Sequence, residues 1–287
     1  MAGSQALAGI RQLFSLSEFE EVLRLQQAIW GFADIELLPL RFLVVVSNVG
    51  GHVFGAFDGD MMVGFCFDIP GIKPGGRPYL HSHMLGVLPA YRNAGIGRRL
   101  KLRQRAEALA EGIELIEWTF DPLELKNAFL NIERLGTVVR RYHENQYGVT
   151  ASPLHGGLPT DRCYAEWWID SPRVRGILAE DQPAAAPPTG RPADTDEALA
   201  GGPVWDQRTA PRTPIPAAAH AGPADPPQCR IAYPADIARL RSGNPRRARE
   251  IQKHNGERFQ HAFQQGLAVT GFERGDTEGA YLLEPWP

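Results

Sequence analysis

The chain has 287 residues, a formal net charge of -3 at pH 7 and a hydrophobic fraction of 43%. This length and composition suffice for one large domain or two small ones with a buried core. The slightly acidic balance argues against a general nucleic-acid binder. The three cysteines, an odd number without metal-ligand spacing, predict a reducing compartment and neither a zinc site nor a disulfide framework.

The N-terminal sequence and the apolar runs bear on location. The first residues lack the arrangement of a secretory signal, and no apolar run reaches the length of a membrane span. We therefore expect a cytoplasmic protein without a membrane partner.

The first part of the chain predicts a strand and two helices. Residues 10–14 are expected to form the strand, and Ser15 is expected to cap the helix that follows it. Residues 37–48 favour a second helix, although the β-branched run at 42–46 leaves a strand open as an alternative.

Three strands are predicted next. Those at 52–57 and 61–68 flank Asp58-Gly59-Asp60, which is the strongest hairpin signal in the sequence. Residues 70–78 are expected to form a loop, because they are rich in glycine and proline. Residues 79–88 are expected to form the third strand.

A glycine turn follows this strand and opens a basic helix. Glycine lets the backbone approach an anion closely, and the unpaired N–H groups of the first helical turn then point at it. The pattern predicts a cradle for a multiply phosphorylated ligand, although a solvated basic helix after a tight turn is the plain alternative. The residues of the cradle are Arg92, Asn93, Ala94, Gly95, Ile96, Gly97 and Arg98.

Two other phosphate-binding loops do not fit this turn. It lacks the Gly-Lys-Ser/Thr ending of a nucleoside triphosphate P-loop. It also lacks the three glycines of the dinucleotide fingerprint.

The chain continues with alternating strands and helices. A strand at 113–120 is expected to lie parallel to the strand at 79–88, which would make a βαβ unit. A helix at 123–135 and strands at 137–142 and 163–169 are expected after it.

The residues around the glycine turn resemble a known family. The order Val87-Leu88-Pro89, Arg-x-x-Gly-x-Gly and Leu100 resembles motif A of the GNAT acyltransferases, and the predicted elements over residues 10–170 are similar to the complete GNAT layout, particularly that of the larger, poorly characterised bacterial members. The resemblance implies an α/β fold with a mixed, mostly antiparallel sheet, flanking helices and two splayed central parallel strands.

The resemblance also implies a cofactor and its position. Acetyl-coenzyme A would serve as acyl donor, with its pyrophosphate in the glycine turn and its pantetheine arm beside Leu85, Gly86 and Val87; no metal is expected. Asn127 and Asn131, four residues apart on one helical face, resemble the family's polar contacts to the pantetheine amides. An exposed helix face is the alternative for these two residues.

Three parts of the chain are expected. Residues 1–179 would form the acyltransferase domain, and residues 180–228, which are rich in alanine and proline, would form a mobile linker. Residues 229–287 predict a C-terminal helix and hairpin, either as a simple extension or as a degenerate GNAT half.

Acyl transfer to an amine requires a base. Strand alternation predicts His81, His83, Leu85 and Val87 on one face and Ser82, Met84 and Gly86 on the other. His83 or His81 could accept the proton, and Glu117 on the next strand is a further candidate. Hydrogen-bonded core histidines, and a Glu117 paired with an arginine, are the plain alternatives.

The departing thiolate requires a proton donor, or leaves unaided. By the resemblance, Ile132 stands where many GNAT enzymes have the donor tyrosine. Tyr142 or Tyr147 could replace it, although aromatic residues on a strand are usually packed.

These observations predict an acyl-coenzyme A-dependent N-acyltransferase that transfers an acetyl group to a small-molecule amine by direct attack. Arg140 and Arg141 could meet an acidic acceptor, although paired arginines are usually divided between a salt bridge and solvent. A non-catalytic coenzyme-binding regulator and acyl transfer from a carrier-protein thioester are the alternatives. No nucleic-acid partner is expected, and a homodimer is compatible with the sequence.

Overall fold

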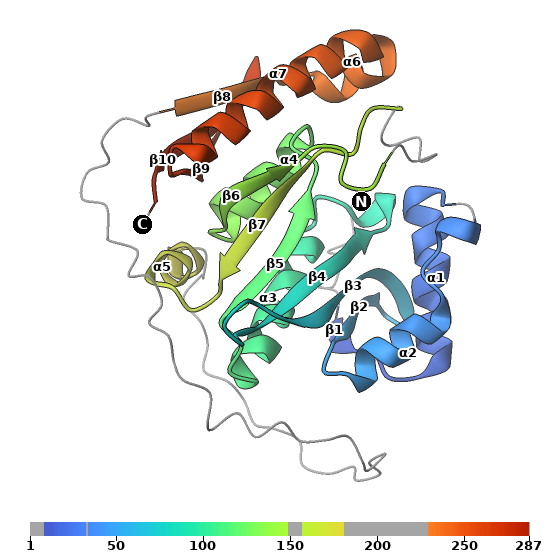
Figure 1. The fold of residues 1–287 in the computed structure, drawn as a ribbon. Coiled ribbons are helices and arrows are strands. Elements are labelled where there is room, and N and C mark those ends of the chain that lie inside the picture. The colour runs from blue at the N-terminus through green and yellow to red at the C-terminus, as the bar shows by residue number, and fades with distance from the viewer. Residues whose placement is uncertain (1–8, 33, 149–156, 181–228, 287) are drawn as a thin grey trace.

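Ten strands of the described residues join in one sheet, with the order β1-β2-β3-β4-β5-β7-β6-β9-β10-β8 (Figure 1). The computed structural model describes residues 9–32, 34–148, 157–180 and 229–286. The strands are β1 (Gly9–Gln12), β2 (Val53–Asp58), β3 (Met61–Ile72), β4 (Pro78–Val87), β5 (Leu115–Phe120), β6 (Val138–His143), β7 (Arg162–Trp168), β8 (Cys229–Pro234), β9 (Leu267–Arg274) and β10 (Glu278–Pro285). The helices are α1 (Leu16–Trp30), α2 (Leu40–Asn48), α3 (Ile96–Ala110), α4 (Leu125–Phe129), α5 (Pro172–Glu180), α6 (Ile237–Gly243) and α7 (Pro245–Gln264).

Helices α1 and α2 pack on one face of strands β2 to β4 (Figure 1). Helix α1 begins with a capping box, in which the Ser15 hydroxyl accepts from the Glu18 N–H at 3.3 Å and the Glu18 carboxylate accepts from the Ser15 N–H at 2.9 Å. The segment at 42–46 is helical, and its buried side chains, Leu43 and Val46, are three residues apart, which is the spacing of one face of a helix. The prediction of a second helix is therefore confirmed.

The hairpin between β2 and β3 is confirmed, and the predicted loop at 70–78 is present but shorter than expected. Strand β3 continues to pair with β4 up to Ile72 opposite Pro78. A Cβ atom on Gly71 would lie 2.5 Å from the Tyr79 ring, so glycine allows the two strands to approach here. Only residues 73–77 separate the strands.

Helix α3 connects β4 to β5 and lies behind them in Figure 1. The two strands are parallel and are the only parallel neighbours among the described strands. The predicted βαβ unit is therefore confirmed, together with the mixed, mostly antiparallel α/β sheet and its flanking helices.

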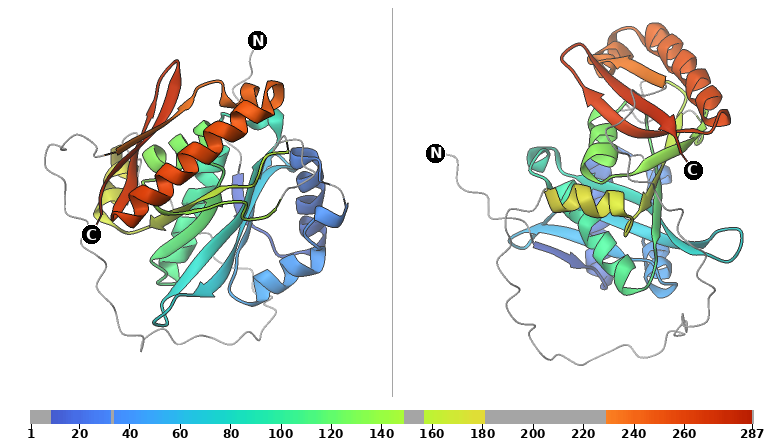
Figure 2. Two further views of the ribbon diagram at one scale, coloured as in Figure 1. Left: turned by 45° about the horizontal axis from the view of Figure 1, so that its top comes forward. Right: turned by 90° about the vertical axis from the view of Figure 1, so that its left-hand side faces the viewer.

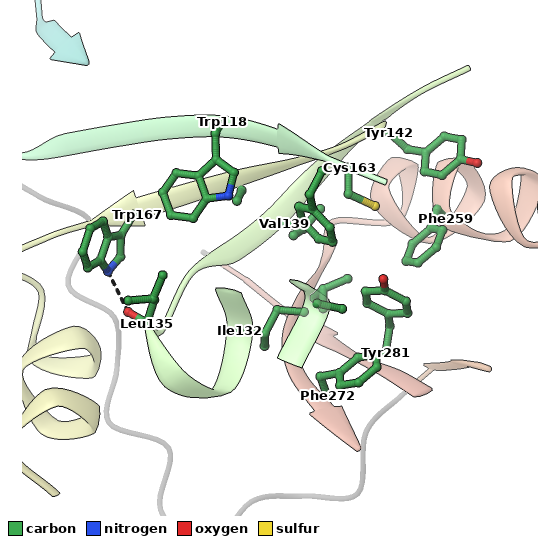
Figure 3. Packing of buried hydrophobic residues seen from close by; sticks show 14 of the residues in the cluster. Trp118, Ile132, Leu135, Val139, Tyr142, Cys163, Trp167, Phe259, Phe272 and Tyr281 are labelled. Atoms are coloured by element: carbon green, nitrogen blue, oxygen red, sulfur yellow. Dashed lines mark hydrogen bonds between the residues drawn. The ribbon is translucent and has the colours of Figure 1, made fainter. Parts of the chain in front are cut away.

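The C-terminal strands extend the same sheet beyond β6, where Val139 pairs with Val269 (Figure 2). Tyr142 of β6 stacks on Phe259 of α7 with ring centroids 5.4 Å apart (Figure 3). The Tyr281 hydroxyl donates to the Pro122 carbonyl at 2.7 Å. One apolar cluster therefore spans both parts of the chain.

Helix α7 begins at Asn244-Pro245, where the Asn244 side chain accepts from the Arg247 N–H at 3.1 Å and caps the helix. Helices α5 and α6 were not predicted. The predicted linker lies almost wholly in residues 181–228, outside the described residues, and the division of the chain into 1–179, 180–228 and 229–287 stays a prediction. None of the described helices is both long and apolar enough to cross a membrane.

Candidate functional site

Strands β4 and β5 separate after a short contact. Their pairing consists of Leu80 with Ile116 and His81 with Glu117. Beyond these pairs β4 follows β3 and β5 follows β7, so residues 82–87 and 118–120 face each other without a ladder. We call this region the splay and its closed end, at Ser82 and Trp118, the apex. Backbone groups along the splay are available to hydrogen-bond an extended ligand.

The predicted arrangement of faces along β4 is wrong because a β-bulge interrupts the alternation. Phe67 pairs with Met84 and Asp68 with Ser82, so His83 is the extra residue. His81, His83, Met84 and Gly86 lie on the face of α1 and α2, whereas Ser82, Leu85 and Val87 lie on the face of α3.

The glycine turn lies at the open end of the splay. Asn93 and Gly95 have φ values of 65° and 76°, and Gly95 caps α3 without a side-chain hydrogen bond. A Cβ atom added to Gly95 would meet nothing within 4 Å, so glycine serves the backbone conformation and open space lies beside it. The first-turn N–H groups of α3 therefore remain available to an anion.

The arginines at the two ends of the turn fix it to the fold. Arg92 donates from Nε to the Val87 carbonyl at 3.2 Å. Arg98 donates from Nε to the Arg134 carbonyl at 3.2 Å, at the end of a π-helical turn over Leu130–Arg134. The turn is thus held at β4 and at the helix after β5, and its residues fit a pyrophosphate.

Helix α3 buries two polar side chains together with apolar ones. Ala106 and Ala110 are exposed, whereas Lys101 and Gln104 are buried together with Ile96, Leu100 and Ala108. The spacing of four residues from Ile96 through Leu100 and Gln104 to Ala108 is a helical signal that could have identified this face. The many basic residues of this helix make its buried face difficult to recognise in the sequence.

Lys101 and Gln104 belong to a buried polar chain between α3 and the sheet. Lys101 Nζ donates to the Ser82 hydroxyl at 2.6 Å, and that hydroxyl donates to Gln104 Oε1 at 3.1 Å. Gln104 Nε2 donates to Asp68 Oδ2 at 2.9 Å, and Asp68 Oδ1 lies 2.9 Å from His52 Nδ1. His52 Nε2 lies 3.0 Å from Glu111 Oε1, at the surface end of the chain. The members of this buried chain are Lys101, Ser82, Gln104, Asp68, His52 and Glu111.

Its two basic groups have opposite pKa shifts. Burial alone would lower the pKa of His52, but the hydrogen bonds to Asp68 and Glu111 outweigh burial and raise that pKa to about 10. Burial lowers the pKa of Lys101 to about 7, because no carboxylate pairs directly with its ammonium group among the described residues. His52 is therefore charged at neutral pH, and Lys101 titrates there.

A second cluster lies on the opposite face of the sheet, over β5, β7 and β6. Glu117 accepts from Lys73 Nζ at 2.5 Å and from Arg141 at 2.8 Å, and Glu166 accepts from Arg140 at 2.5 Å. We call these five residues the open-face network. In Figure 1 no helix of the described residues covers this face of β5 and β7.

A bulge in β6 brings the two arginines together. Val139 pairs with Ala165 and Tyr142 with Cys163, so Arg140 and Arg141 both stand opposite Tyr164. Both are ion-paired and half-buried rather than divided between a salt bridge and solvent. Glu117 is likewise paired with cations, which was the plain alternative to its role as a base.

The two histidines lie beside the apex on the face opposite α3. Their ring centroids are 5.9 Å apart, and His83 also packs on Phe67. Burial, and next the neighbouring His83, lower the pKa of His81 to about 4. Partial burial also lowers the pKa of His83, which keeps part of its surface open to solvent. His83 is the better placed proton acceptor of the two.

The structure does not bring Tyr142 to the splay. Strand β7 separates β6 from β5, and the buried Tyr142 hydroxyl donates to Asp161 at 2.6 Å. Burial raises its pKa. Tyr147 lies nearer, since its hydroxyl is 3.0 Å from the Thr119 hydroxyl on β5. Ile132 is fully buried in the apolar cluster (Figure 3).

Asn127 and Asn131 have different surroundings. Asn127 is exposed, whereas Asn131 is buried. The π-helical turn that begins at Leu130 changes the residue spacing of an α-helix, so two residues four apart no longer stack on one face. No group of histidine, cysteine and acidic side chains that could hold a metal is present in the described parts of the chain.

Comparison with known proteins gives one family. Residues 10–130 match the model of the acetyltransferase (GNAT) family. No match is found among curated proteins.

Several solved structures align with part of this chain. A GNAT-family protein from Desulfovibrio desulfuricans has 17% identity and a TM-score of 0.45, with 56% of this chain and 99% of that chain covered. YncA from Salmonella typhimurium, solved with its cofactor acetyl-CoA, has 18% identity and a TM-score of 0.47, with 57% and 95% covered. An aminoglycoside acetyltransferase from an uncultured soil metagenomic sample has 19% identity and a TM-score of 0.39, with 42% and 83% covered. The matched residues, 10–130, include the strand, glycine turn and helix described above.

Proposed function

We propose that the protein transfers an acyl group, in the first instance acetyl, from coenzyme A to a small-molecule amine. The observation that supports this proposal most strongly is the splay of β4 and β5, with the N-terminus of α3 at its open end, where Gly95 stands at the cap position and no side chain of the described residues occupies the first-turn N–H groups. The turn would hold the pyrophosphate, and the unpaired edge of β4 along Leu85, Gly86 and Val87 would hydrogen-bond the pantetheine arm.

The pantetheine arm would lie between the strands rather than against a face of β4. A Cβ atom on Gly86 would lie 2.7 Å from the Trp30 ring, so α1 already covers that face. On the other face Leu85 contacts α3 near Gly97. The arm would therefore bring the thioester to the apex.

The acceptor amine would approach the apex from the face opposite α3, where His83 lies. His83 would accept the proton of the attacking ammonium, because its lowered pKa keeps the ring neutral at pH 7. Glu117 would act as a structural anion that holds Lys73 and Arg141 in place. Hydrogen bonds from Asn127 and Asn131 to the arm stay part of the proposal.

A second candidate function is coenzyme binding without turnover. It is favoured by one observation, that Ile132 is buried and apolar and Tyr142 is committed to Asp161. In that case the protein would bind acetyl-coenzyme A and acylate none of a panel of amines. Turnover with an acyl carrier protein but not with free acetyl-coenzyme A would indicate carrier-linked transfer.

Replacement of Gly95 by glutamate tests the cradle. Bulk and negative charge at this position should abolish acetyl-coenzyme A binding and amine acetylation, because the pyrophosphate would meet a carboxylate. Calorimetric titration and an amine-panel assay on the same sample would measure both.

Gly266→Glu is the matched control. Gly266 has a φ of 78° and open space around it, as Gly95 does, but lies at the end of α7. The control should lose a similar amount of stability and keep coenzyme binding. Unchanged affinity in Gly95→Glu would contradict the placement of the pyrophosphate.

A further inference from the structure

Lys101 is a buried cation without an ionic partner. Its residue is 4% exposed, and its ammonium group has two contacts, the Ser82 hydroxyl at 2.6 Å and the face of Trp118 at 3.6 Å from the ring centroid. None of the ion pairs among the described residues includes it. A buried lysine without a carboxylate costs stability, so a structural role alone does not explain it.

Both contacts lie at the apex of the splay. Ser82 follows the last paired residue of β4, and Trp118 follows the last paired residue of β5. Lys101 Nζ therefore spans the point where the strands separate, on the α3 face. At about 3.3 Å per residue, Ser82 lies about 17 Å from Val87 at the glycine turn, a span comparable to an extended pantetheine arm.

We propose that Lys101 donates the proton that the departing coenzyme A thiolate takes up. This inference rests on the proposed function, because it requires the thioester to lie at the apex. Lys101 would then act as the proton donor, a role that Ile132 cannot fill because it has no hydroxyl group.

The step balances as follows in atoms and charge. The amine nitrogen of the acceptor bonds to the thioester carbon, and the C–S bond breaks with its electron pair on sulfur. One N–H bond of the Lys101 ammonium breaks and an S–H bond forms, which leaves a neutral lysine amine and free coenzyme A. The amine recovers a proton from solvent after the coenzyme departs, and the acceptor nitrogen has released its own protons to His83 and then to water.

The surroundings of Lys101 suit this exchange. Burial lowers its pKa to about 7, and the proton then passes downhill to a thiolate, because the pKa of a thiol is about 8.5. The ionisable groups that act on Lys101 are Cys66 and Asp68 of β3. Lys101 in turn lowers the pKa of His81 on β4.

Ser82 and Gln104 are positioning residues for this lysine. The Ser82 hydroxyl donates its proton to Gln104, which leaves an oxygen lone pair to accept from Lys101. Gln104 is oriented by Asp68, so the hydrogen-bond direction is fixed along the chain. The ammonium group is thereby held on the splay side of the helix.

Lys101→Met tests the inference, with Arg103→Met as the control on the exposed side of the same helix. Lys101→Met should bind acetyl-coenzyme A as the unchanged protein does and should transfer acetyl at least about 100-fold more slowly at saturating substrates. The rate of the unchanged protein should decrease above about pH 7, as Lys101 loses its proton, and this decrease should be absent in Lys101→Met.

A leaving group that needs no proton separates catalysis from structure. The selenoester analogue of acetyl-coenzyme A releases a selenol, which is far more acidic than a thiol. Lys101→Met should therefore regain most of the lost rate with the selenoester. A purely structural lysine would show the same loss with both donors.

The possible results are distinguishable. Equal transfer rates for Lys101→Met and the unchanged protein would overturn the inference and leave the proposed function intact. Absence of acetyl-coenzyme A binding by the unchanged protein would overturn both. If Lys101→Met does not fold, Ser82→Ala is the alternative, because it keeps the ammonium group and removes the hydrogen bonds of Ser82 to Lys101 and Gln104. A pH profile of Ser82→Ala identical to that of the unchanged protein would then overturn the inference.

Discussion

Two charged clusters lie on opposite faces of the sheet at the apex, and the cations of the two clusters have different kinds of partner. In the open-face network each of Lys73, Arg140 and Arg141 has a carboxylate partner and stays partly in contact with water. In the buried chain His52 has two carboxylate neighbours, whereas Lys101 has a hydroxyl and an indole ring.

The difference supports the proposal that Lys101, rather than the open-face network, takes part in the reaction. Ion pairs near water contribute little to stability and cost little to form. A polar chain in the interior stabilises the fold only if every member is satisfied, and a cation left without a counter-ion must be compensated elsewhere. Lys101 is the member for which a ligand, rather than a protein carboxylate, would complete the site.

The largest expected effect is that of Asp68→Asn. Asp68 is fully buried and accepts from the His52 backbone, the His52 ring and Gln104. The substitution leaves a buried imidazolium with weakened pairing, so the free energy of unfolding should decrease by about 3–5 kcal/mol. Urea denaturation at pH 7 measures this change. A decrease below about 1 kcal/mol would mean that the buried chain contributes no more to the free energy of unfolding than a network of surface ion pairs does.

The pH dependence of stability should reveal His52 and Lys101 separately. The folded pKa of His52 is raised to about 10, so its contribution is complete below its unfolded pKa of about 6.5 and is lost as the pH rises towards 10. The folded pKa of Lys101 is lowered to about 7, whereas its unfolded pKa is about 10.4. Between these two pH values the lysine is protonated in the unfolded chain but not in the folded protein, so the free energy of unfolding rises with pH. The two slopes oppose each other between pH 7 and pH 10.

Single substitutions should expose each slope. Between pH 7 and pH 10, relative to the unchanged protein, Lys101→Met should lose stability with rising pH and His52→Asn should gain it. Each slope should reach about 1 kcal/mol per pH unit. Denaturation midpoints at four pH values suffice, and parallel curves for the two variants would contradict the assigned shifts.

Glu117→Gln should have a smaller effect. Its partners Lys73 and Arg141 have side chains 25% and 38% exposed, so water can replace the lost carboxylate. The free energy of unfolding should decrease by about 1 kcal/mol. The same urea assay applies, and a loss as large as that of Asp68→Asn would remove the distinction between the two faces.

Local sequence signals predicted much of the fold. The Ser15 cap, the Asp58-Gly59-Asp60 turn and the strand, turn and helix around Gly95 each depend on residues close in sequence. These elements are present as expected.

The site was less predictable, because bulges in β4 and β6 break the period of two on which strand faces were assigned. The bulge in β4 places the consecutive residues His83 and Met84 on the same face of the sheet, and the bulge in β6 places both Arg140 and Arg141 opposite Tyr164. The burial of Lys101 could not be inferred from a run of basic residues, since its partners Ser82 and Trp118 come from separate strands.

Calorimetric titration of the unchanged protein with acetyl-coenzyme A tests the central claim most directly. The predicted result is one coenzyme molecule bound per chain, with the heat of binding abolished in Gly95→Glu and retained in Gly266→Glu. Absence of binding, or binding that Gly95→Glu leaves unchanged, would contradict the assignment of the glycine turn and the splay as the coenzyme site.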